Sequence, residues 1–292
     1  MSRALLAAAS LALATPPVLV DGPGIRTLPR LGYGARPHVL RGFERFRLRF
    51  RLPAGVRQGH GRWYVLRLHV RVEPNLRSLV GRAMIDVETS LRAPCAGAFV
   101  HEQRLGDAEL VSWQTGGVFG ASRPLELAGT AARPVIEGTL TAPCILDSLR
   151  GGVNEIDVGQ SREGAASFRS LLVFADTGLY MQRGELREPR PRGPFVTIEP
   201  LVPARPLRAG ARLVLPFRVI RASDVHVSAV VVVRARVLGA ARLLAASRRL
   251  RLPGGQGALA HGRVVLRALR RGPALLLLAV GDTRVLVAWR VR

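Results

Sequence analysis

The sequence contains no lysine, only two cysteines and few aromatic residues. All 44 basic residues are arginines. Two cysteines are too few for a disulfide scaffold or a four-cysteine zinc module, and the 6 histidines are scattered, so we expect neither a metal nor another cofactor. Aromatic residues make up 5% of the chain, which excludes the dense stacking ladder of proteins that bind single-stranded nucleic acid. We therefore expect no specific nucleic-acid partner.

Negative charge is also scarce. Against the 44 arginines stand 20 carboxylates, and the net charge is +24 over 292 residues. Such a surface attracts anionic polymers, including the acidic polymers of a cell wall. The exclusive use of arginine is also typical of a GC-rich genome, so codon bias with solubility is the alternative explanation. At 48% hydrophobic residues the chain has enough apolar material for one or two cores, which excludes wholesale disorder.

Long hydrophobic runs are missing except at the N-terminus. After Arg3, an apolar run extends from Ala4 to Ala14, and two prolines then end any helix. This pattern predicts a signal peptide over residues 1–14, with an uncleaved anchor reaching Val20 as the alternative. The longest apolar run elsewhere, Ala274 to Val280, is about half of a membrane span. We expect a secreted or cell-surface protein whose mature chain has no transmembrane span.

Export places the two cysteines in an oxidising compartment. Cys95 and Cys144 each end an L-x-A-P-C motif, which is a small internal repeat. A bridge between them closes a loop of about 50 residues and would stabilise the fold by roughly 4 kcal/mol. A reactive or metal-binding pair is the alternative, but neither cysteine has a C-x-x-C spacing or a neighbouring histidine. We predict a structural disulfide.

Alternation of apolar and polar residues dominates the periodicity. Between Phe46 and Leu52 every even position is apolar and every odd position is arginine, and Tyr64 to Val72 repeats the alternation. This is the period of half-buried strands, and no amphipathic helix of four turns is visible. Further strands are predicted at 83–91, 98–103, 108–114, 134–141, 154–159, 168–175, 212–220, 225–237, 242–252, 262–269, 274–280 and 283–291. Gly/Pro turns between such strands indicate an all-β sandwich.

The organisation follows from the proline distribution. Three prolines within residues 189–194 predict a Pro-rich linker, which divides a jelly-roll-like β-sandwich domain over 37–188 from a smaller immunoglobulin-like β-sandwich over 195–292. Residues 15–36 form an extended N-terminal segment. From Thr197 onward, 18 arginines face three carboxylates, a net +15, so the second part has the higher density of positive charge.

The C-terminal part resembles the immunoglobulin-like modules of exported bacterial surface proteins. The resemblance rests on two neighbouring strand motifs, Phe217-Arg218-Val219 and Val225-His226-Val227, and on Gly262. It also rests on a turn, Arg270-Arg271-Gly272-Pro273, that leads into a strand ending at the Asp turn Gly281-Asp282. The N-terminal part is similar in architecture to jelly-roll carbohydrate-binding modules. Both resemblances imply surface display or binding and assign no individual residue.

Enzyme signatures are absent. His101-Glu102 lacks the second histidine of H-E-x-x-H, and residues 159–164 miss G-x-S-x-G by one residue. Asp86 and Glu88 lie on the same face of a predicted strand. They could act as a catalytic acid and base, as calcium ligands, or as ordinary solvated side chains. Asp157 and Asp176 lie near loops as further candidate calcium ligands.

Binding chemistry has more support. Trp63, Arg67, His69 and Arg71 are predicted on the polar face of one strand, where an indole ring offers a stacking surface and arginines offer hydrogen-bond donors. Trp113 and Tyr180 are candidate additions to this platform. In the alternative interpretation Trp63 caps the edge of the core and Trp113 is a core residue.

These observations predict a secreted, non-catalytic protein that binds a cell-envelope polysaccharide or an anionic envelope polymer. Two alternatives stay open. One is an exported polysaccharide hydrolase that uses carboxylates such as Asp86, Glu88 or Asp176, and the other is a purely structural surface or adhesion protein.

Overall fold

The computed structural model describes residues 17–20, 22, 24–57, 61–74, 80–89, 95–105, 108–114, 120–142, 149–160, 169–184, 194–202 and 206–292. In these residues the fold is all-β, as predicted, and the one helical element is the 3-10 turn η1, Pro29–Leu31. No helix among them is long and apolar enough to cross a membrane. The predicted signal segment 1–14, Cys144 and residues 189–193 of the predicted linker lie outside the described residues.

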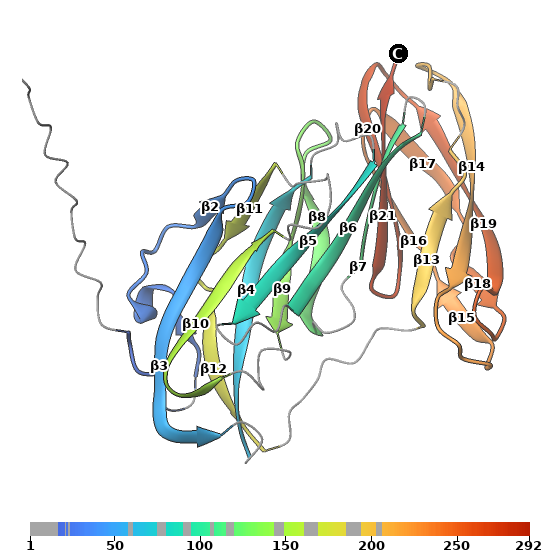
Figure 1. Cartoon of the computed structure of the whole chain (residues 1–292). Helices are drawn as coiled ribbons and strands as arrows, with labels where there is room; N and C mark the ends of the chain where they lie inside the picture. Colours follow the sequence, from blue (N-terminus) through green and yellow to red (C-terminus); the bar gives the residue numbers. More distant parts are fainter. Residues whose placement is uncertain are drawn as a thin grey trace, which may run out of the picture.

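The described strands form four sheets, and the pairs within them are antiparallel (Figure 1). Sheet A has the order β16-β20-β21-β7-β6-β5-β10-β3. Its strands are β3 (Arg45–Arg57), β5 (Val80–Thr89), β6 (Cys95–Leu105), β7 (Ala108–Gln114), β10 (Arg150–Gln160), β16 (Arg234–Gly239), β20 (Gly272–Val280) and β21 (Thr283–Val291). Sheet A therefore contains strands from both sides of the predicted linker.

Sheet B packs on one side of sheet A. It consists of β1 (Arg26–Thr27), β2 (His38–Leu40), β4 (Arg62–Glu73), β8 (Gly120–Gly129), β9 (Pro134–Ala142), β11 (Ser170–Val173) and β12 (Gly178–Arg183). Sheet C consists of β13 (Val196–Pro200), β14 (Arg212–Arg221), β17 (Ala241–Ala246) and β19 (Leu259–Ala268). The small sheet D pairs β15 (Ala229–Val232) with β18 (Arg249–Leu252).

Two hydrophobic cores follow from this layering. The first lies between sheets A and B and buries the even-numbered apolar residues of the two alternating strands, such as Phe50 and Leu68, both 0% exposed. The second lies between sheet C and the β20–β21 part of sheet A, and it contains Trp289 and the fully buried Phe217. Alternation thus places one side of each strand in a core, as the sequence predicts.

The β20–β21 hairpin belongs to both cores. Leu275, Leu277, Leu286 and Ala288 pack in the first core, whereas the intervening residues, including Leu276 and Val287, pack in the second. A strand buried on both faces needs an almost continuous apolar sequence rather than alternation. This explains why 274–280 is the longest apolar run outside the N-terminus.

β21 also joins the two parts of the chain by hydrogen bonding. It pairs with β7 from Thr283↔Gln114 to Trp289↔Ala108. Arg284, near the start of β21, is a buried residue at 5% exposure. Its guanidinium donates to Glu126 of β8 at 3.0 Å and to the carbonyl of Gly281 at 2.6 Å. The C-terminal hairpin therefore contacts both layers of the first sandwich.

Two predicted strands of the C-terminal part are wrong in extent. The predicted strand 225–237 is divided into β15 of sheet D and β16 of sheet A, and 242–252 is divided into β17 of sheet C and β18 of sheet D. In each case the chain leaves one sheet and enters another within a few residues. Within the predicted extended segment 15–36, the structure has β1 and η1, and β1 pairs with β12.

His38 of β2 packs among aromatic rings, and we expect it to make the stability of the fold depend on pH. Its ring centroid lies 4.4 Å from that of Phe46, and its Nε2 is buried without a hydrogen-bond partner in the described part of the chain. Burial lowers the pKa of His38 below the ordinary 6.5, because the apolar surroundings disfavour the charged ring.

A pKa that is lower in the folded state means that stability is fully present above the unfolded-state value and is lost as pH falls below it. We expect the free energy of unfolding, measured by urea denaturation, to fall between about pH 7.5 and 5.5. His38→Leu should flatten this dependence, whereas His226→Gln, at a fully solvated position with 86% of its side chain exposed, should not. An unchanged slope in His38→Leu would contradict the assignment.

Candidate functional site

The candidate site is the outward face of β4, the central strand of sheet B. Tyr64, Leu66, Leu68, Val70 and Val72 point into the first core and are 0% exposed. The odd-numbered residues point to the other face, so Trp63, Arg67, His69 and Arg71 follow one another along it. From Trp63 to Arg71 this row is about 26 Å long, at about 3.3 Å per residue.

β11 and β12 pair with the same edge of β4, and the turn between them carries Asp176 to its face. β12 pairs with residues 62–67 and β11 with residues 70–73, which leaves His69 opposite the turn. Thr177 fixes this turn: its hydroxyl accepts a bond from the His69 amide at 3.0 Å and donates to the His69 carbonyl at 3.2 Å. The backbone amide of Phe174 donates to the same carbonyl at 3.0 Å.

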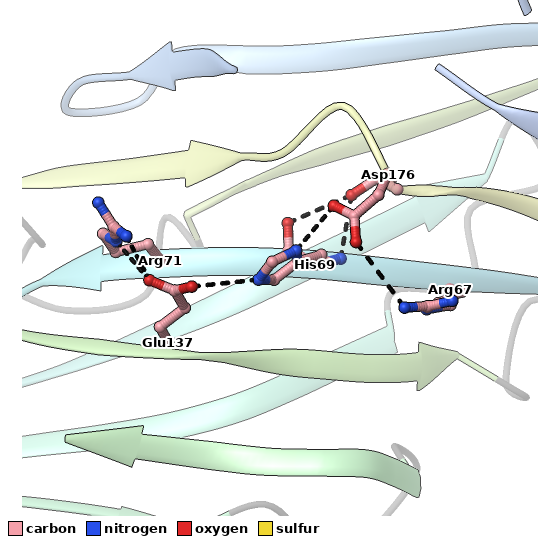
Figure 2. A network of polar contacts seen from close by, with 6 residues as sticks. Arg67, His69, Arg71, Glu137 and Asp176 are labelled. Carbon is pink, nitrogen blue, oxygen red and sulfur yellow. Dashed lines mark hydrogen bonds and ion pairs between the residues drawn. The ribbon is translucent and has the colours of Figure 1, made fainter. Parts of the chain in front are cut away.

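A chain of polar contacts connects five side chains (Figure 2). Asp176 lies 2.7 Å from Nδ1 of His69 and 3.7 Å from the guanidinium of Arg67. On the other side, Nε2 of His69 lies 3.4 Å from Glu137, whose second oxygen accepts bonds from Nε of Arg71 at 2.6 Å and from its terminal nitrogen at 2.5 Å. Glu137 comes from β9, where it pairs in register with Arg71.

Phe174 supports the same network from the β11 side. The His69 ring stacks on it at 4.3 Å between centroids, and the Arg71 guanidinium lies 5.1 Å from its centroid. Stacking and cation–π contacts of this kind restrict the rotamers of the polar residues they involve. The Arg71, His69 and Glu137 side chains are therefore held in fixed positions.

The exposed polar side chains of the face come from its two ends and from the turn. The side chains of Arg67, Arg71 and Asp176 are 41%, 38% and 50% exposed, whereas those of His69 and Glu137, between them, are at 23% and 27%. Tyr180 of β12 lies opposite Val65 and so shares this face. Burial raises the pKa of Tyr180, and the nearby Arg67 partly offsets this shift.

Trp63 lies at the start of the same face. It is half-buried, and its indole nitrogen donates to the carbonyl of Gly184 at 3.0 Å, which fixes the orientation of the ring. It lies opposite Gln182 of β12, one step along the face from the Tyr180 pair. An oriented indole, a phenol, a guanidinium and a carboxylate thus share one exposed surface, which we call the β4 face: Trp63, Arg67, Asp176 and Tyr180.

The structure brings five of the six predicted binding residues onto the strands of this face: Trp63, Arg67, His69, Arg71 and Tyr180. Trp113 lies in β7 of sheet A, paired with Val100 and Arg284, and so is on a different sheet. Sequence reasoning missed Glu137 and Phe174. Both are conspicuous only once β9 and β11 are placed beside β4.

The predicted carboxylate candidates are separated. Asp176 joins the network, Asp157 accepts from Nε of Arg47 at 2.9 Å, and Asp86 and Glu88 lie on β5 opposite Gly159 and Asp157 of β10. Among the residues described, no group of three or more His, Cys, Asp or Glu side chains is arranged to hold a metal ion. Cys95 begins β6 opposite Val87, and its predicted partner Cys144 is outside the described residues.

Comparison of the chain with protein-family models, with curated proteins and with solved structures finds no match.

Proposed function

We propose that this is an exported, non-catalytic protein of the cell envelope that binds a polysaccharide on the β4 face. The proposal rests on one observation: half-buried aromatic rings from β4 and β12 lie on the same face as an exposed guanidinium–carboxylate pair, Arg67 and Asp176. Sugar rings present an apolar face and several hydroxyls, and this surface offers a stacking partner with donors and acceptors beside it.

The fixed positions of His69, Arg71 and Glu137 favour such binding. A site whose side chains are already ordered loses little conformational entropy when the ligand arrives. His69 holds Asp176 at 2.7 Å, and Arg71 with Glu137 holds His69 from behind. Within this proposal the first sandwich is jelly-roll-like and the second immunoglobulin-like, the signal segment 1–14 directs export, and Cys95 and Cys144 form a disulfide.

The test is binding of the mature chain, Thr15 to Arg292, to neutral and acidic envelope polysaccharides. Trp63→Ala and Tyr180→Ala should each weaken binding by about tenfold or more, as expected when about 1.4 kcal/mol of ring contact is lost. Phe195→Ala is the matched control, because Phe195 is an exposed ring, at 46%, far along the chain from this face. Equal losses in all three variants, or none, would overturn the proposal.

A polysaccharide hydrolase is the second candidate, because Asp176 and Glu137 lie on the two sides of His69. Paired carboxylates hydrolyse glycosides when one is the acid and the other the base or nucleophile. Release of reducing ends from a bound polysaccharide, abolished in Asp176→Asn, would support this candidate. Binding without cleavage in the wild-type chain would exclude it for that polysaccharide.

A further inference from the structure

Three arginines lie side by side across the outward face of sheet C. Arg212 of β14 pairs in register with Arg267 of β19, and Arg267 pairs in register with Arg242 of β17. We call this set the arginine row. Residues directly opposite each other on antiparallel strands have Cβ atoms about 5 Å apart, so three like charges lie within about 10 Å of one another.

The arginine row has no internal partner. All three side chains are exposed, and none makes an ion pair or a hydrogen bond through its guanidinium within the part of the chain that the structure describes. Like charges directly opposite each other destabilise a sheet. The row therefore costs the fold stability that an anionic ligand would return.

The carboxylates of the C-terminal part are elsewhere. Glu199 pairs with Arg218, and Asp224 lies 3.7 Å from His226. Asp282 is next to Thr283, which donates to the carbonyl of Val196 at 2.7 Å. Val196 pairs with Arg221, at the end of β14 opposite to Arg212.

More positive charge gathers at the end of sheet C where the row lies. The segments that carry Arg208 and Arg270 are tied to this end, because Gly210 donates to the carbonyl of Ala268 at 2.8 Å and Leu269 donates to the carbonyl of Ala240 at 2.8 Å. Further along β19, Arg263 is exposed on the same face as Arg267. The local field therefore favours an anion with several charges over a single small ion.

We propose that the arginine row binds a linear acidic polysaccharide that lies across the strands of sheet C. Guanidinium groups bind carboxylates in a two-bond geometry, and strands about 4.8 Å apart present them at regular intervals to a polymer with charged monomers. The outward residues of β13, β14, β17 and β19 include no Trp, Tyr or Phe, so this face lacks the ring platform that single-stranded nucleic acid requires.

This site is separate from the β4 face, and its failure would leave the proposed function unaffected. Trp63→Ala tests the β4 face and leaves the arginine row intact. Conversely, removal of the row leaves every residue of the β4 face in place. In Trp63→Ala, a neutral polysaccharide should bind more weakly, whereas an acidic polysaccharide should keep the salt-dependent contribution of the arginine row.

The test uses the mature chain and immobilised polygalacturonate over about 50 to 300 mM salt. The triple variant Arg212→Gln, Arg242→Gln, Arg267→Gln should bind about tenfold or more weakly at low salt and with a shallower dependence on salt. The matched control is Arg30→Gln, Arg36→Gln, Arg41→Gln, which removes the same charge at three exposed positions of the N-terminal part. It should change affinity by less than about twofold.

The row variant should also unfold at the same or a higher temperature than the wild type, because repulsion is removed. This result excludes misfolding as the cause of lost binding. Equal loss in the two triple variants would mean that net charge alone acts and would overturn the proposal, as would no loss in either. Double-stranded DNA that binds through the row as tightly as polygalacturonate would overturn the assignment to a polysaccharide.

Discussion

A chain that ends at Gly193 is expected not to fold into a cooperative unit, although it retains the whole of the predicted first domain. It would lack β21, which pairs with β7 over the full length of that strand. It would also lack Leu275, Leu277, Leu286 and Ala288, the C-terminal contribution to the first core. Urea denaturation should show a broad, weak transition instead of a sharp one.

Point variants on β21 test the same feature without truncation. Leu286 and Val287 are neighbours, both 0% exposed, and face the first and the second core respectively. Leu286→Ala should cost about 2 to 5 kcal/mol and Val287→Ala somewhat less, since it deletes less side-chain volume. Because the hairpin belongs to both cores, each variant should shift one common unfolding transition. Two transitions, each shifted by one variant only, would contradict a shared hairpin.

Arg221 is the second position where a large effect is expected. It is 2% exposed, and its guanidinium donates to the carbonyls of Pro253 at 2.9 Å, Val227 at 3.1 Å and Leu252 at 3.4 Å. These bonds tie the ends of the segments around β15 and β18 to β14. Arg221→Ala removes the donors, leaves buried carbonyls unsatisfied and creates a cavity, so we expect a loss of about 3 kcal/mol or more.

The control for this prediction lies on the same strand. Arg218 is paired with Glu199 at the surface, and Arg218→Ala should cost about 1 kcal/mol or less. Thermal or urea unfolding of the two variants measures the difference. If the two losses were the same, the carbonyl contacts of Arg221 would not stabilise the fold.

The sequence was sufficient to predict local structure where one residue pattern decides it. Alternation in β4 predicts which side chains share its outward face, and 108–114 and 283–291 are predicted with the bounds that β7 and β21 have. Their pairing could not be predicted, because β7 lies in the N-terminal part, β21 lies at the end of the C-terminal part, and pairing depends on the whole arrangement of strands. An apolar run such as 274–280 likewise fits a buried helix or strand equally well.

The candidate site was only partly predictable for a similar reason. Trp63, Arg67, His69 and Arg71 follow from the period of one strand. The position of Glu137 depends on the register between β9 and β4. The positions of Phe174 and Asp176 depend on where the turn between β11 and β12 lies along β4. No local sequence pattern specifies either feature. The arginine row could not be predicted for the same reason, since its three residues come from three strands and are brought together only by their register.

Hydroxyl-radical footprinting of the wild-type mature chain, with and without a bound envelope polysaccharide, tests the account most directly, because it requires no substitution. We expect reduced oxidation of Trp63 and Tyr180 on binding and unchanged oxidation of Phe195. Both rings are half-buried on the β4 face, and Phe195 lies next to β13. Protection confined to other residues, with Trp63 and Tyr180 unchanged, would contradict the assignment of polysaccharide binding to the β4 face.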